Sequence, residues 1–121
     1  MIKKIDTEYP NIVAFQFEGE VDKNDFDHVV IPAVEQQVRE IDEINLIFIL
    51  ETSISNFTAG AWWKDAMLGL NNITKWNRSA IVTDSEAIQN FTKVFSVVMP
   101  GEFKGFDKDN YKYATDWAAG E

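Results

Sequence analysis

The chain has 121 residues, of which 45% are hydrophobic and 13% aromatic, and a formal net charge of −9 at pH 7. These values predict one folded domain over residues 1–121, and the acidic balance argues against nucleic acid as a partner, because phosphate binding needs clustered Lys and Arg. Cysteine is absent, no apolar run approaches the roughly 18 residues of a membrane span, and no secretory h-region is present, so we expect a cytoplasmic protein without disulfides.

Two short strands open the chain. Residues 2–6 are partly apolar, and residues 12–19 place Val13, Phe15 and Phe17 on one face. Tyr9-Pro10-Asn11 between them is typical of a turn. This pattern predicts a β-hairpin.

A helix follows the hairpin. Asp22 and Asp25 can cap it, and apolar residues then recur at intervals of three and four on one face. These residues are Phe26, Val29, Val30, Ala33, Val34, Val38 and Ile41. Pro32 interrupts the stretch, so it either starts the main helix in its first turn or kinks it. His28 is the single histidine and is assigned a surface or capping role, because no partner motif for catalysis accompanies it.

The rest of the chain alternates between strands and helices. Residues 44–50 are nearly all apolar, as in a central strand that is covered on both faces. We expect a second helix over residues 58–73, a strand over 79–83, a third helix over 85–98, a strand over 103–106 and a C-terminal helix over 110–119.

The predicted fold class is therefore α/β. The order β-β-α-β-α-β-α-β-α predicts a single-layer mixed, mostly parallel five-stranded sheet with four flanking helices, in which the first hairpin adds an antiparallel strand. Ligands of open sheets bind beyond the carboxyl ends of the strands. We expect a site there, built from residues 51–57, 83–85 and 99–102.

The start of the predicted second helix is the most distinctive segment. Small residues leave backbone N–H groups accessible there, which suits an anionic head group. Adjacent tryptophans point about 100° apart on a helix, so either Trp63 packs in the core and Trp62 covers an edge, or at least one lines an apolar cavity. The candidate ligand-binding residues are Phe57, Thr58, Ala59, Gly60, Trp62, Trp63, Thr83, Asp84, Met99 and Pro100.

Known chemical motifs are missing. The segment from Asp22 to Asp27 superficially resembles a calcium loop, but Phe26 stands where an oxygen ligand is needed and Asp27 where glycine is needed. Phosphate-binding glycine motifs are also absent. We expect no metal, no cofactor and no enzyme activity, and an enzyme that uses Asp65, Asp84 or Glu102 is the weakest alternative.

These segments resemble the SpoIIAA-like family, whose members are relatives of STAS domains and are linked to the lipid-binding SEC14 fold. The resemblance covers nearly the whole chain. It is carried by Ile31-Pro32-Ala33-Val34-Glu35, Phe57-Thr58-Ala59-Gly60-Ala61 with Trp63, Asp65, Gly69 and Leu70, Val82-Thr83-Asp84, and Met99-Pro100-Gly101-Glu102. It implies a mixed sheet flanked by helices.

The resemblance implies two functions. Our first hypothesis is a non-enzymatic module that binds or carries a lipophilic or amphipathic small molecule near the second helix, with transient membrane contact. The alternative is a STAS-type regulatory domain that docks a protein partner and is phosphorylated at Thr58. STAS regulators carry an Asp-Ser pair at that position, where this chain has Asn56-Phe57-Thr58. We expect a monomer or a weak homodimer, and an exposed edge strand would support the dimer.

Overall fold

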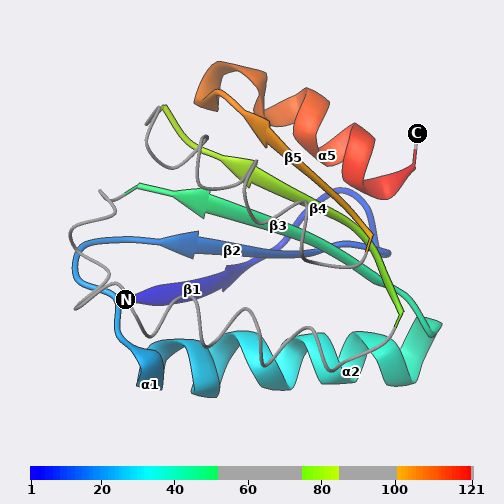
Figure 1. Cartoon of the computed structure of the whole chain (residues 1–121), viewed down its shortest axis with the longest axis horizontal. Coiled ribbons are helices and arrows are strands. Elements are labelled where there is room, and N and C mark those ends of the chain that lie inside the picture. The colour runs from blue at the N-terminus through cyan, green and yellow to red at the C-terminus, as the bar shows by residue number, and fades with distance from the viewer. Residues whose placement is uncertain (52–74, 85–100, 121) are drawn as a thin grey trace.

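Five strands form one mixed sheet in the order β1-β2-β3-β4-β5 (Figure 1). The computed structural model describes residues 1–51, 75–84 and 101–120. The strands are β1 (Ile2–Ile5), β2 (Val13–Phe17), β3 (Ile44–Leu50), β4 (Trp76–Val82) and β5 (Glu102–Phe106). β1 runs antiparallel to β2, and β2 to β5 are parallel to one another. The predicted hairpin and the mostly parallel sheet are thus confirmed.

Two of the four predicted helical segments lie in the described part of the chain. The first is a continuous run of α1 (Lys23–Asp25), a π turn (Phe26–Val30) and α2 (Ile31–Ile41). The second is α5 (Tyr111–Ala119), which follows a 3-10 turn (Lys108–Asn110). The helices expected over 58–73 and 85–98 fall outside the described residues, so the structure shows two helical segments where four were expected.

The first helical run begins with a capping box. The Asp22 carboxylate accepts from the backbone N–H of Asp25, whose own carboxylate accepts from the N–H of Asp22. Pro32 lies in the first turn of α2, as one of the two readings expected. Proline has no backbone N–H to donate, and its ring needs room near the preceding turn. The wider π turn just before α2 accommodates the missing hydrogen bond and the ring. His28 is exposed, and its Nδ1 lies 2.7 Å from the carbonyl oxygen of Asn24, so it has the expected surface role.

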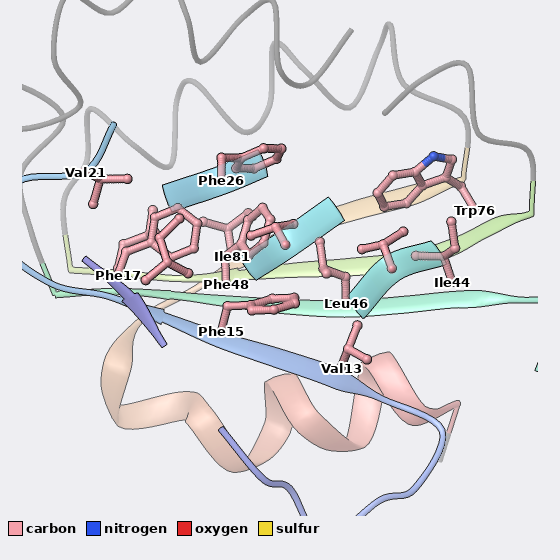
Figure 2. Close-up of a cluster of buried hydrophobic side chains, with 14 residues drawn as sticks. Val13, Phe15, Phe17, Val21, Phe26, Ile44, Leu46, Phe48, Trp76 and Ile81 are labelled. Carbon is pink, nitrogen blue, oxygen red and sulfur yellow. The ribbon is translucent and has the colours of Figure 1, made fainter. Parts of the chain in front are cut away.

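The sheet separates two hydrophobic clusters. Phe15, Phe17, Phe26 and Phe48 belong to the cluster on the α2 face, and the ring centroids of Phe17 and Phe48 are 4.9 Å apart. Figure 2 shows this cluster on one side of the sheet, with α5 on the other. The second cluster, beneath α5, consists of Ile12, Ala14, Ile47, Ile49, Ala80, Val82, Ala114 and Ala118. All seven residues of β3 are buried, which confirms a central strand covered on both faces.

A buried polar network ties α2 to the amino ends of the parallel strands. The side chain of Gln37 donates to the carbonyls of Asn11 and Asn45 and accepts from the N–H of Asn45, at 3.0–3.3 Å. Asn45 also donates to the carbonyl of Asn11 at 3.0 Å and accepts from the Asn77 amide at 2.8 Å. Because each of these buried groups has a partner, the network fixes the position of α2 without an unpaired polar atom.

Candidate functional site

The carboxyl ends of the four parallel strands are tied together in two pairs by backbone hydrogen bonds. The N–H of Glu51, just past β3, donates to the carbonyl of Phe17 at the end of β2, at 2.8 Å. The N–H of Thr83, just past β4, donates to the carbonyl of Phe106 at the end of β5, at 2.9 Å. The residues that leave the sheet at this edge are therefore fixed in position, as ligand-binding side chains at such edges require.

A depression of about 260 Å³ lies at this edge, on the face that α5 covers. Its lining residues are Gln16, Ile49, Glu51, Val82, Lys108 and Tyr111. Ile49 and Val82 project from β3 and β4 and form an apolar floor. Gln16, Glu51 and Lys108 supply polar groups around it. An apolar floor with a few polar groups is the usual chemistry of a small-molecule site.

Glu51 and Lys108 form an ion pair across the depression. The Lys108 Nζ lies 2.6 Å from Glu51 Oε2, and the two side chains are 35% and 36% exposed. Partly exposed pairs of this kind contribute at most about 1 kcal/mol, so an anionic or cationic ligand can replace either partner at little cost.

Tyr111 stands between this depression and a neighbouring one of about 410 Å³. The second depression is lined by Asp6, Thr7, Glu8, Tyr111, Lys112 and Thr115. Burial, and secondarily the negative charge of Glu8, raise the pKa of Tyr111 above its ordinary value of 10.0. The phenol therefore keeps its proton at neutral pH and can both donate and accept a hydrogen bond.

Two of the ten predicted site residues are described, and both lie at this edge. Thr83 is 2% exposed and uses its backbone to hold β5, while Asp84 is exposed and its Oδ1 accepts from the backbone N–H of Lys108 at 3.0 Å. Both residues position the turn that carries Lys108 and do not line the depression themselves. Phe57, Thr58, Ala59, Gly60, Trp62, Trp63, Met99 and Pro100 lie outside the described residues.

Sequence reasoning did not identify Lys108 and Tyr111. Both follow the carboxyl end of β5, just as Asp84 follows that of β4. The rule that ligands bind beyond the carboxyl ends of parallel strands placed Asp84 at this edge, and it applies equally to Lys108 and Tyr111. It was not applied to them because the sequence pattern of β5 was weak.

The segment over residues 99–102 was expected to join the same edge, and its described part does not. Glu102 pairs with Arg78 at the start of β5, and a Cβ on Gly101 would lie 2.9 Å from the carbonyl oxygen of Asn77. In a parallel sheet the start of a strand lies at the edge opposite its carboxyl end. Four residue steps of about 3.3 Å each separate Glu102 from Phe106, so Glu102 lies at the edge opposite Asp84.

Within the described ranges, no group of three or more His, Asp or Glu side chains is arranged to hold a metal ion. Among the helices that the structure describes, none is long and apolar enough to cross a membrane.

Comparison with known proteins agrees with this architecture. The SpoIIAA-like family model matches residues 12–119. Among solved structures, the chain is similar to an uncharacterised Shewanella loihica protein with a SpoIIAA-like fold, with 26% identity, a TM-score of 0.66 and coverage of 98% of this chain and 92% of the other. No curated protein matches significantly. The fold supports a binding or regulatory module in general terms, and the match over most of its length shows that this chain belongs to the SpoIIAA-like family.

Proposed function

We propose that the chain is a non-enzymatic binding module for an amphipathic small molecule with an anionic head group. The observation that carries the proposal is the depression at the carboxyl edge of the sheet, where an apolar floor of Ile49 and Val82 lies beside the Lys108 ammonium. The apolar part of the ligand rests on the floor, and its anion takes the place of Glu51 beside Lys108.

The size of the depression limits what it accepts. Pockets for drug-sized ligands span about 300–1,000 Å³, and this depression holds about 260 Å³. It therefore accommodates a head group and a short apolar segment. The remainder of a longer ligand extends beyond the depression. We assign Phe57, Trp62, Trp63 and Met99 as its apolar wall and Thr58, Ala59 and Gly60 as its backbone donors. That assignment rests on the sequence.

The first experiment is native mass spectrometry of the purified full chain, followed by solvent extraction. A co-purifying amphipathic anion at near-unit stoichiometry supports the proposal and gives the ligand class. An empty protein is then titrated with the fluorescent anion 1-anilinonaphthalene-8-sulfonate, with circular dichroism as the check that each variant is folded.

Two charge reversals provide the matched comparison. Lys108→Glu should weaken binding of the dye about tenfold, because it puts a second carboxylate beside Glu51. Lys75→Glu should leave binding unchanged, since Lys75 pairs with Asp42 at the opposite, amino edge of the sheet. Equal loss in both variants, or no loss in either, would show that the depression does not bind the anion.

A second candidate function is a STAS-type regulatory domain that docks a protein and is phosphorylated at Thr58. The observation that favours it is a set of exposed carboxylates on and just before the first helical run, at Asp22, Asp27, Glu35 and Glu40. Such a surface suits a basic partner. Peptide mapping of protein from its native host tests the switch: a phosphate on Thr58 supports it, and a Thr58→Glu variant that leaves partner capture unchanged argues against it.

A further inference from the structure

Aromatic rings and cations gather where β5 meets α5, away from the depression. We call the residues Arg78, Lys104, Phe106, Tyr113 and Trp117 the aromatic–cationic surface. The Trp117 ring is at its centre, with the Phe106 ring centroid 5.9 Å away. Arg78 lies 5.5 Å from the centroid of the Trp117 ring, and Lys104 lies 5.9 Å from it. Both contacts are within the range of a cation–π interaction.

Arg78 is held in place before any partner binds. Its Nη1 donates to the carbonyl oxygen of Trp117 at 2.7 Å, and its Nε lies 3.6 Å from a carboxylate oxygen of Glu102. The guanidinium and the indole therefore form a preorganised platform. Little side-chain freedom remains to be lost there on binding, which favours affinity.

Lys104 carries the charge that remains available on this surface. Its ammonium also lies 5.3 Å from the centroid of the Phe106 ring, and no carboxylate of the described residues lies within ion-pair distance of it. Counted over the described residues alone, two cations and the carboxylate of Glu102 leave one positive charge in excess here, on a chain whose net charge is −9. The surface is thus complementary to an anion.

The residue types match those that dominate protein interfaces. Tyr113 lies one helical turn before Trp117 on the same side of α5 and is 68% exposed, the largest exposed fraction among the large hydrophobic side chains described. Trp, Tyr and Arg are the residues most enriched among binding hot spots. In β5, Glu102, Lys104 and Gly105 are also exposed, so the surface continues onto this strand.

We propose that the aromatic–cationic surface docks an acidic segment of a partner protein. Tyr113 and Trp117 contact apolar side chains of the segment, and Lys104 pairs with one of its carboxylates. A short acidic segment fits better than a polyanionic lipid surface or nucleic acid. Those extended surfaces would repel the strongly acidic chain as a whole, whereas a segment is attracted locally, within a Debye length of about 10 Å.

The test is an NMR titration of the full chain at about 0.1 M salt, where the Debye length is about 10 Å, with a blocked peptide of alternating Glu and Leu as the probe. The indole Nε1–H signal of Trp117, assigned with Trp117→Phe, should shift and saturate. Lys104→Glu and Tyr113→Ala should each weaken binding about tenfold and leave the fold intact, because both side chains are exposed. Lys23→Glu is the control, since this exposed lysine pairs with Asp27 on the first helical run and should leave binding unchanged.

Four outcomes would overturn the proposal. The first is a matching peptide of alternating Lys and Leu that shifts the Trp117 signal equally. The second is an affinity for the acidic peptide that neither Lys104→Glu nor Tyr113→Ala changes. The third is Lys104-dependent binding to phosphatidylserine vesicles without peptide binding, which would assign the surface to lipid. The fourth is Lys104-dependent self-association without peptide binding, which would assign it to a second copy of this chain.

Discussion

Replacement of Gly101 by alanine should destabilise the protein more than any other Gly→Ala change at a described left-handed glycine. Gly101 has φ +83°, and a Cβ there would lie 2.9 Å from the carbonyl oxygen of Asn77 and 3.1 Å from the carbonyl carbon and oxygen of Trp76. All three atoms belong to the backbone of β4, so no side-chain rotation relieves the overlap.

Two terms add to the cost. A left-handed conformation costs a residue with a Cβ about 1–2 kcal/mol. Forcing an extra carbon into a packed site adds about 1–3 kcal/mol. Gly101→Ala should therefore lower the free energy of unfolding by about 2–5 kcal/mol. Gly19→Ala is the control, because Gly19 has φ +57° and no atom within 4 Å of the added carbon, so only the first term applies.

Urea denaturation followed by circular dichroism measures both variants. The expected result is a lower midpoint with an unchanged slope, and a loss for Gly101→Ala that exceeds the loss for Gly19→Ala by about 1–3 kcal/mol. The gain from a stiffer unfolded chain is similar in the two variants and cancels in this comparison. Equal losses would refute the argument that Gly101 is needed for the close approach to β4.

Three further predictions concern polar groups that are buried or partly buried. Gln37→Leu should cost about 1–3 kcal/mol of unfolding free energy in urea denaturation, because the N–H of Asn45 loses its partner. Ser79→Ala should be neutral or should stabilise by up to about 1 kcal/mol in the same assay, because the buried Ser79 hydroxyl has no hydrogen-bond partner among the residues that the structure describes. The free energy of unfolding should fall as the pH rises above about 10, because Tyr111 ionises there in the unfolded chain while it keeps its proton in the folded one. In ultraviolet titration, Glu8→Gln should lower the raised pKa of Tyr111 only partly, since burial is the larger cause of the shift.

Each of these predictions has an outcome that would contradict it. Gln36→Leu changes an exposed neighbour of Gln37, and an equal loss there would show that the buried network is not responsible. A destabilised Ser79→Ala would mean that the hydroxyl has a partner. A Tyr111 pKa that returns fully to 10.0 in Glu8→Gln would mean that charge, not burial, dominates.

Hydrophobic periodicity predicted the described fold well wherever one face of an element is apolar. β3 has the expected bounds, and Phe15, Phe17, Phe26 and Phe48 lie in the expected core. The start of β4 was missed by three residues. The missed part of β4 contains Asn77 and Arg78, whose polar side chains form hydrogen bonds with distant parts of the chain. Such partners cannot be recognised from the alternation of apolar and polar residues in the sequence.

The candidate site was predicted less completely, for a related reason. The rule for parallel sheets located the edge and therefore Thr83 and Asp84, but it does not say which elements converge there. Lys108 and Tyr111 come from the chain that follows β5, the neighbour of β4 on the side away from β3. The turn that carries Lys108 is held by the hydrogen bond to Asp84. Gln37 was not predicted to be buried, because only apolar residues were used to define the buried face of the helix.

The π turn before Pro32 has a consequence for the alignment of the first helical run. On an α-helix, residues four apart are displaced by about 40° around the axis, because there are 3.6 residues per turn. The wider π turn rotates less per residue and offsets this displacement, so Phe26, Val30 and Val34 all stay buried along one line. A π turn holds about one residue more than an α turn, so a one-residue deletion within it would leave an ordinary α turn and keep the capped first turn at Asp22 facing the same way, whereas the same deletion within α2 would rotate everything before it by about 100°.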